Sequence, residues 1–215
     1  MKKIPGIYRQ WTESLQKHGY EPEELVFGAG NPKAEVLLIG EAPGAEEVAA
    51  GEPFVGKAGR NLNEFLSATG IAREMLYITN VVKFRPYRVS ASGRKSNRSP
   101  SKKEIALCAG CLEEEISAIV PKVIVTLGNT ALQAVLGEEM RIGICHGMVQ
   151  AVEPPVFPLY HPASIIYRPS LREEYARDME KLRFYLKRKL LEVSYRVPFS
   201  HSHSEQEQGE RKRND

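Results

Sequence analysis

The chain has 215 residues, of which 42% are hydrophobic and 27% charged, with a formal net charge of +3. This length fits one domain that buries roughly 70–75% of its unfolded surface, so its core needs no disulfide framework. No apolar run approaches the ~18 residues of a membrane helix, and residues 1–5 lack the apolar stretch of a secretory signal. Three cysteines are a sparse, odd set that suits a reducing compartment. We therefore expect a cytoplasmic globular domain that does not enter a membrane.

Short apolar runs alternate with amphipathic segments along the chain. Residues 1–24 are expected to form an N-terminal helical segment that ends near Gly19, and Ser101 and Glu104 have the spacing of a capping box at a helix start. The predicted strands span residues 35–40, 76–82, 122–127 and 156–160, and the predicted helices span residues 59–69, 101–120, 129–136 and 171–191.

This alternation predicts an α/β fold with three layers, α/β/α, around a central, mostly parallel four-stranded sheet. We expect residues 25–198 to form this domain and residues 199–215, which lack apolar anchors, to be a disordered polar tail. In such sheets ligands bind beyond the carboxyl ends of the strands. The informative motifs of this chain fall at those ends.

The first predicted strand ends in a glycine–proline loop at residues 40–47. Such a loop lets the backbone approach a ligand, although a tight turn with solvated glutamates gives the same pattern. A second loop, residues 53–59, places Phe54 before a glycine-rich stretch. Its ring can plug the loop onto the core or serve as an aromatic platform, and the glycines can admit a phosphate near the next helix.

Asn80 and a run of basic residues follow the second predicted strand. An amide inside an apolar strand offers one acceptor and two donors in one plane, which match either a nucleobase edge or a backbone edge. Every charged residue between positions 82 and 103 is a lysine or arginine. A run of one sign beside a strand end favours a polyanion such as the phosphate backbone over a merely solvated loop.

The third and fourth predicted strands also end in polar residues. We expect Asn129 and Thr130 to cap the helix that follows the third strand rather than to contact a phosphate. His161 follows the fourth strand, and the apolar pair Ile165 and Ile166 comes shortly after it. A lone histidine is more often structural, but an exposed apolar pair can act as a wedge between bases.

Together these segments resemble the uracil-DNA glycosylase superfamily, and in particular its type 4 branch. The resemblance covers roughly residues 25–190 in collinear order. It rests on Gly-Glu-Ala-Pro-Gly at 40–44, Gly51 with Pro-Phe-Val-Gly-Lys-Ala-Gly at 53–59, Ile-Thr-Asn-Val-Val-Lys at 78–83, Arg-Ser-Pro-Ser at 98–101, Leu-Gly at 127–128 and His-Pro-Ala-Ser at 161–164.

The resemblance implies hydrolysis of the N-glycosidic bond of deoxyuridine in DNA, after the uracil has been flipped out of the duplex. It implies that Phe54 stacks on the base and that Asn80 reads the Watson–Crick edge. His161 and the backbone N–H of Ala42 would donate to uracil O2, where negative charge develops. The implied partner is uracil-containing DNA, single- or double-stranded, and we expect the chain to act as a monomer.

Two carboxylates and a group of basic and loop residues complete the implied site. Glu41 would orient or activate the attacking water and balance the cationic sugar, with Glu47 as a second candidate. The residues implied to contact DNA are Lys57, Lys83, Arg85, Arg94, Lys95, Arg98, Ser164, Ile165, Ile166 and Arg168. Of these, Ile165, Ile166 and Arg168 would occupy the loop that enters the minor groove.

The chain departs from the family at several positions. Ala42 stands where the best-known branch has a water-activating Asp, and Gly44 where that branch excludes thymine with a Tyr. Type 4 members usually carry a four-iron cluster held by four cysteines, but here only Cys108 matches a ligand position and Phe84 stands at the third. We therefore expect no metal or cofactor, and we expect apolar packing to take the place of the cluster. Asn97 stands at the position of a histidine through which another branch traps itself covalently on the abasic sugar. An amide is a poor nucleophile, so we expect turnover rather than trapping.

Two other interpretations stay open at this point. The missing cluster ligands and Ala42 are compatible with a DNA- or abasic-site-binding module that has weak or no excision activity. An α/β hydrolase acting on a small nucleotide is the third interpretation, and it predicts no salt-dependent affinity for DNA.

Overall fold

The computed structural model describes residues 3–192. The expected polar tail at 199–215 and the end of the expected domain, residues 193–198, lie outside the described residues. The helices are α1 (Ile4–Gln16), α2 (Ala45–Ala50), α3 (Lys57–Thr69), α4 (Lys102–Ile119), α5 (Gly128–Leu136), α6 (Ile142–Cys145), α7 (Pro162–Tyr167) and α8 (Arg172–Glu192), with short 3₁₀ turns at Pro22–Glu24, Arg73–Met75 and Pro169–Leu171. The strands are β1 (Ala29–Gly30), β2 (Val36–Gly40), β3 (Leu76–Asn80), β4 (Tyr87–Val89), β5 (Lys95–Asn97), β6 (Val123–Leu127) and β7 (Val156–Leu159).

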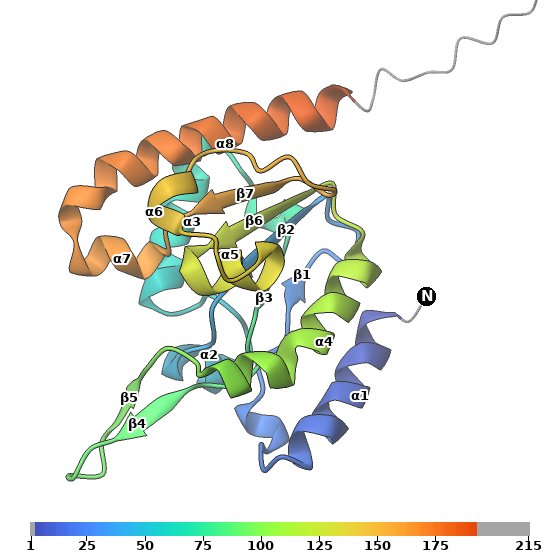
Figure 1. Ribbon diagram of the computed structural model, residues 1–215, viewed down its shortest axis with the longest axis vertical. Helices are drawn as coiled ribbons and strands as arrows, with labels where there is room; N and C mark the ends of the chain where they lie inside the picture. The colour runs from blue at the N-terminus through green and yellow to red at the C-terminus, as the bar shows by residue number, and fades with distance from the viewer. Residues whose placement is uncertain (1–2, 193–215) are drawn as a thin grey trace, which may run out of the picture.

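The central sheet has the strand order β1-β3-β2-β6-β7 (Figure 1). The four predicted strands are its parallel members, β3, β2, β6 and β7. The fifth strand, β1, is antiparallel to β3 and only two residues long, and no apolar run marks it in the sequence. The second predicted strand ends at Asn80, two residues earlier than expected, because the backbone bends away from the sheet there.

The two faces of the sheet are buried by different helices, which confirms the three-layer prediction. Strand β2 is buried along its whole length, and its side chains alternate between the two cores. Val36 and Leu38 pack with residues of α3 and α8, whereas Leu37 and Ile39 pack with residues of α1 and α4. This burial on both sides explains why the strand is an unbroken aliphatic run.

The sequence predicts an irregular stretch over residues 85–100, but the structure has a β-hairpin there. Strands β4 and β5 pair antiparallel as a separate two-stranded sheet, with Tyr87 opposite Asn97. The hairpin projects from the body beside α2 (Figure 1). Its turn is closed by the Ser90 N–H, which donates to the Arg94 carbonyl, and by Gly93 at φ +78°. The short, polar strands hid the alternation by which a hairpin is recognised.

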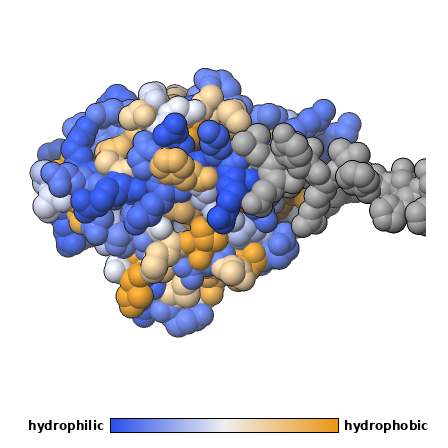
Figure 2. All heavy atoms as spheres, turned by 90° about the horizontal axis from the view of Figure 1, so that it is seen from above, coloured by the Kyte–Doolittle hydropathy of each residue, from blue (hydrophilic) through white to orange (hydrophobic). Residues whose placement is uncertain are grey.

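The outer surface is dominated by polar and charged residues. Figure 2 shows the side that carries α8, where hydrophobic residues form smaller groups between hydrophilic ones. None of the helices described here is both long and apolar enough to cross a bilayer.

The start of α4 is stabilised by a residue that the sequence had implied in DNA contact. The Arg98 guanidinium donates to both carboxylate oxygens of Glu104, at 2.7 and 2.8 Å. Glu104 also accepts from the backbone N–H of Ser101 at 2.7 Å, which completes the predicted capping box. The Arg98 side chain is therefore engaged by an ion pair with the capping residue of α4, and its contact with a phosphate stays a prediction.

Replacing Glu104 by Gln tests this cap. The Arg98 guanidinium holds the pKa of Glu104 at about 2, below its ordinary 4.5. A lowered pKa stabilises the fold fully above pH 4.5, and this stabilisation is lost as the pH falls toward 2. We expect Glu104→Gln to lower the free energy of unfolding by about 1 kcal/mol at pH 7 and by less at pH 3, as measured by urea unfolding.

The matched control is Glu138→Gln, because Glu138 pairs with Lys102 on the open surface. This variant should unfold close to the wild type at both pH values. A Glu104→Gln deficit that is as large at pH 3 as at pH 7 would contradict the assignment.

Candidate active site

A cavity of about 610 Å³ lies beyond the carboxyl ends of the parallel strands. It is enclosed by the loops that follow β2 and β3, the loop before α3, the β4–β5 hairpin and the start of α7. Most of the predicted site residues line it, namely Ala42, Glu47, Phe54, Lys57, Asn80, Arg85, Arg94, Lys95, His161 and Ile166.

An aromatic ring, a carboxamide and an imidazole converge in this cavity. Gly40 ends β2, and a Cβ atom built on it would lie 2.4 Å from Asn80 Oδ1 and 2.4 Å from Phe54 Cζ. The ring and the amide therefore meet over bare backbone. The ring centroid of His161 is 6.0 Å from that of Phe54. The three side chains therefore border one part of the cavity.

Phe54 is held in this place by an uncommon backbone conformation. Its φ is +57°, in the left-handed region that a bulky residue adopts only where the surroundings fix it. The first turn of α3 crosses directly over it, and a Cβ atom on Gly59 would lie 1.9 Å from the Phe54 carbonyl oxygen. Phe54 belongs to the apolar core, as the loop-plug interpretation predicts, and it also lines the cavity, where its role as an aromatic platform stays a prediction.

The carboxamide of Asn80 faces the cavity with its hydrogen-bonding capacity unused. Asn80 is 2% exposed, yet within residues 3–192 no hydrogen bond engages its side chain. Only its backbone carbonyl is bonded, by the ammonium of Lys83 at 2.5 Å. A buried amide aimed into a cavity with no protein partner is suited to bind a polar ligand edge.

The geometry of His161 fixes which of its nitrogens faces a ligand as a donor. His161 is the N-cap of α7, and its Nδ1 accepts the backbone N–H of Ala163 at 3.2 Å. The neutral ring then carries its proton on Nε2. Burial lowers the pKa of His161 below its ordinary 6.5, while the charges of Glu41 and Glu47 oppose this effect. The imidazole is therefore a neutral donor near pH 7.

Glu41 precedes Ala42 but is not among the residues that line the cavity, and its carboxylate is held by Thr130, for which the sequence predicts a capping role. The hydroxyl of Thr130 donates to Glu41 Oε2 at 2.6 Å. Helix α5 has no side-chain cap, and Asn129 instead accepts from the backbone N–H of Ile142 at 2.9 Å. The capping prediction is therefore wrong. The signal that could have found Thr130 is its place just after β6, at the same sheet edge as Glu41.

Glu47 joins the two loops that form one wall of the cavity. Its Oε2 accepts from the backbone N–H of Gly44 at 3.1 Å, and its Oε1 accepts from that of Gly56 at 2.8 Å. These two glycines precede α2 and α3. Glu47 is thus placed to hold the loop of Ala42 against the loop of Phe54.

Basic side chains form another part of the cavity wall, and the hairpin residue Asn97 lies beside Gly44. Those that line the cavity are Lys57, Arg85, Arg94 and Lys95. The ammonium of Lys95 lies 4.2 Å from the ring centroid of Tyr87, and Arg85 Nε donates to Asn97 Oδ1 at 2.7 Å. The hairpin therefore presents ordered positive charge to the mouth of the cavity.

The assignment of Lys83 as a DNA contact is wrong. Its side chain is completely buried, and its ammonium lies 2.6 Å from Glu115 Oε2. A phosphate outside the protein cannot reach it. The sequence showed the charge of Lys83 but not its partner, which is far away along the chain.

The loop implied to enter the minor groove is the short helix α7, and one of its residues points inward. Ile165 is 4% exposed and packs in the core, so its assignment as a wedge is wrong. The exposed apolar residues here are Ile166 at 43% and Tyr167 at 83%, and both line the cavity. Ser164 is half-buried and Arg168 is exposed.

The residues beside Cys108 do not fit a four-thiolate cluster. The chain has three cysteines, and Cys108, Cys111 and Cys145 are all buried free thiols. Burial raises the pKa of both thiols on α4, which disfavours the thiolate form that binds metals. Phe84, at the position of an expected ligand, stacks on Tyr20 with ring centroids 3.7 Å apart. Nowhere in residues 3–192 do three or more His, Cys, Asp or Glu side chains form a group that could hold a metal ion.

Comparisons with known proteins agree with this geometry. The chain is 43% identical over 166 residues to the type-4 uracil-DNA glycosylase of Archaeoglobus fulgidus, which covers 73% of this chain and 79% of that protein. It is 39% identical to the type-4 enzyme of Sulfurisphaera tokodaii, over 74% of this chain and 73% of that protein. The type-4 enzyme of Thermotoga maritima is 38% identical, over 76% of this chain and 84% of that protein.

A family model gives the same assignment. The model of the uracil DNA glycosylase superfamily matches residues 27–186, which include β2, β3, β6 and β7 with every loop that lines the cavity. The chain therefore belongs to the uracil-DNA glycosylase superfamily.

Proposed function

We propose that this uracil-DNA glycosylase flips uracil into the cavity between Phe54, Asn80 and His161 and hydrolyses its N-glycosidic bond, which initiates base excision repair. The convergence of these three side chains is the observation that supports the proposal. Flipping costs a few kcal/mol. Stacking of the base on an aromatic ring returns about 1–3 kcal/mol of this, and contacts to the DNA backbone supply more.

Asn80 selects the base. Its unused carboxamide oxygen accepts from uracil N3–H, and its NH₂ group donates to uracil O4. Cytosine presents the opposite pattern at these two positions. With its oxygen toward N3 and its nitrogen toward O4, the amide rejects cytosine, because a mismatch would leave buried polar groups unpaired.

His161 and Ala42 stabilise the leaving base. When the glycosidic bond breaks, negative charge develops on uracil O2. The Nε2–H of His161 and the backbone N–H of Ala42 donate to this oxygen, and the neutral state of the imidazole suffices for that role. Donors aimed at developing charge contribute on the order of 3 kcal/mol each.

Glu41 acts on water and on the sugar. Its carboxylate, oriented by Thr130, positions the attacking water and stabilises the positive charge of the oxocarbenium-like sugar. Glu47 contributes negative charge to the same region while it holds the two loops together.

The basic wall binds DNA without reading its sequence. Lys57, Arg85, Arg94 and Lys95 contact phosphates, and Arg168 extends this surface beyond α7. Ile166 and Tyr167 enter the space that the flipped base leaves.

One chain supplies all the residues that line the cavity, which supports a monomer. The free cysteines of the chain suit the cytoplasm.

Excision of uracil from a single-stranded oligonucleotide tests the proposal. Under single-turnover conditions we expect His161→Ala to lower the rate about 10²–10³-fold, because one donor to the leaving base is lost. Glu41→Gln should lower it about 10²–10⁴-fold. Glu52→Gln, an exposed carboxylate outside the cavity, is the matched control and should keep the wild-type rate.

Equal release of uracil by wild type, His161→Ala and Glu41→Gln would discard the proposed roles. Absence of release by all three, together with retained affinity for abasic DNA, would favour the binding-module interpretation instead.

The protonation of His161 can be followed by NMR titration of its ring. We expect a pKa below the ordinary 6.5, because burial disfavours the charged form. In Glu41→Gln the pKa should fall further, because one of the charges that raise it is gone. Glu52→Gln should leave the titration unchanged, and an unchanged titration in Glu41→Gln would refute the coupling.

We propose that the chain works without an iron–sulfur cluster, with the Tyr20–Phe84 stack packed beside Cys108 in its place. Protein from iron-supplemented cells should contain no stoichiometric iron, and a chelator should not slow excision, because three cysteines cannot supply four thiolates. Cys108→Ala should keep the wild-type rate. Iron that is retained, and whose removal abolishes excision, would contradict this proposal.

A further inference from the structure

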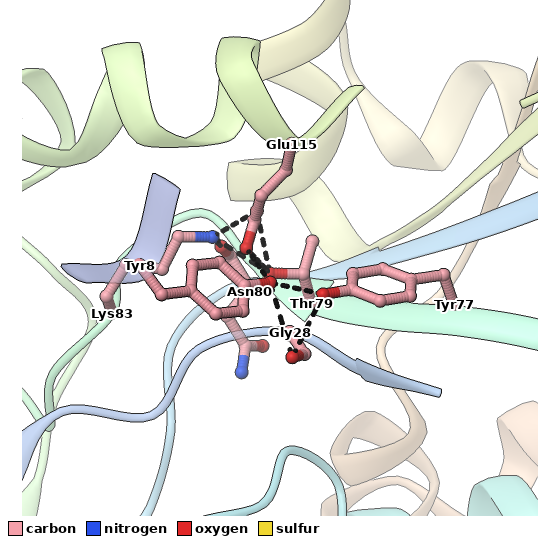
Figure 3. Close-up of polar contacts among 7 residues, drawn as sticks. All are labelled: Tyr8, Gly28, Tyr77, Thr79, Asn80, Lys83 and Glu115. Carbon is pink, nitrogen blue, oxygen red and sulfur yellow. Dashed lines mark hydrogen bonds and ion pairs between the residues drawn. The ribbon is translucent and has the colours of Figure 1, made fainter. Parts of the chain in front are cut away.

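A buried polar network contacts the backbone of Asn80, whose carboxamide points away from the other side chains of the network (Figure 3). Its centre is the ion pair between Lys83 and Glu115, whose side chains are both 0% exposed. Lys83 follows β3, and Glu115 comes from α4. Burial of two charges is costly and rarely improves stability over apolar packing, so the pair needs another explanation.

The ammonium of Lys83 makes three hydrogen bonds with three different acceptors. It donates to Glu115 Oε2 at 2.6 Å, to the hydroxyl of Thr79 at 2.8 Å and to the backbone carbonyl of Asn80 at 2.5 Å. An ammonium has three protons, so each of them has an acceptor. The geometry of Lys83 is therefore fully determined.

Glu115 is held from the other side by hydroxyl groups. Tyr8 from α1 donates to Glu115 Oε1 at 2.7 Å, and Thr79 donates to Oε2 at 2.9 Å. The hydroxyls of Tyr8 and Tyr77 contact each other, and both lie within hydrogen-bonding distance of the Gly28 carbonyl. Burial raises the pKa of both tyrosines, which keeps their hydroxyls protonated as donors.

The sheet does not supply the hydrogen bond that Lys83 gives to Asn80. The N–H of Val81 donates to Gly40 in β2 at 2.9 Å. In a trans peptide the carbonyl of Asn80 points the opposite way, toward the side of β1. Strand β1 pairs with β3 only at Tyr77 and Ile78, so it ends before it reaches Asn80. The Lys83 ammonium takes the place of the missing strand.

We propose that Lys83, held in place by Glu115, is a positioning residue for the base-reading amide of Asn80. The peptide that follows Asn80 is fixed by Gly40 on one side and by Lys83 on the other. This fixes the direction in which the Asn80 side chain leaves the backbone, and hence the angle at which its amide meets the base. The inference rests on the proposed function, because it assigns Lys83 an effect that passes through Asn80.

The test is a double-mutant cycle between Lys83 and Asn80. The double substitution Lys83→Met with Glu115→Gln removes the donor to Asn80 and leaves no buried charge unpaired. Lys83→Leu with Glu115→Met, an apolar pair of similar size, is carried in parallel, so that the test does not depend on one variant folding. Each pair is made in the wild type and in Asn80→Ala, and single-turnover uracil excision is measured below the melting temperature of every variant.

Tyr8→Phe is the matched control within the same network. It removes the hydroxyl bonds to Glu115 and Gly28 but keeps the bond from Lys83 to Asn80. We expect Tyr8→Phe to lower the melting temperature and to keep the excision rate.

In the wild-type background we expect the paired substitutions to lower the excision rate about tenfold or more, because small misplacements of positioning groups are costly to a rate. In the Asn80→Ala background they should add less than about twofold, because the group through which Lys83 acts is already gone.

An equal fold-loss in both backgrounds, or a loss in Tyr8→Phe that matches that of the paired substitutions, would overturn the inference and leave a purely structural role. Excision by the wild type itself tests the proposed function separately. A wild-type chain that releases no uracil fails at that earlier step, whereas an active wild type with independent losses fails only the inference about Lys83.

Discussion

The absence of a side chain at Gly40 is the constraint on which the site depends. Strand β2 brings its carboxyl end to within van der Waals distance of both Phe54 and Asn80, and any Cβ atom there would collide with the ring and the amide. The two groups can form one slot only because the backbone between them is bare. The rest of the fold serves this contact: α3 crosses over the Phe54 backbone, and the β3 ladder carries Asn80 alongside Gly40.

Acidic and basic side chains meet beside the loop that follows β2. Glu47 is held there by the backbone N–H groups of Gly44 and Gly56, and the hairpin residue Asn97, which accepts from Arg85, lies against the same Gly44. In the proposed function the carboxylates balance a cationic sugar while the hairpin binds the anionic phosphates, so both charges act from neighbouring segments.

Buried strands and the motifs at their ends could be predicted from the sequence. Contacts between residues far apart along the chain could not. The aliphatic run of β2 and the motifs at the strand ends could be found because parallel strands end at a common edge. Burial could not be read from charge: in the sequence Lys83 resembles its basic neighbours, and only the fold brings Glu115, 32 positions away, beside it. The assignment of Ile165 as a wedge is wrong for the same reason, because a helical turn directs its side chain inward and leaves that of Ile166 exposed.

The hairpin of β4 and β5 has an exposed tip that can vary independently of the side chains at the centre of the site. Within residues 3–192 its two strands pair only with each other, its turn at residues 90–94 is exposed, and Asn80, Phe54 and His161 lie outside it, beyond the carboxyl end of the central sheet. Exposed loop tips tolerate changes of length far better than buried strands do. Evolution can therefore lengthen, shorten or recharge the tip at residues 90–93, and so alter how much of a nucleic acid the enzyme contacts, while the hairpin residues that line the cavity keep their places.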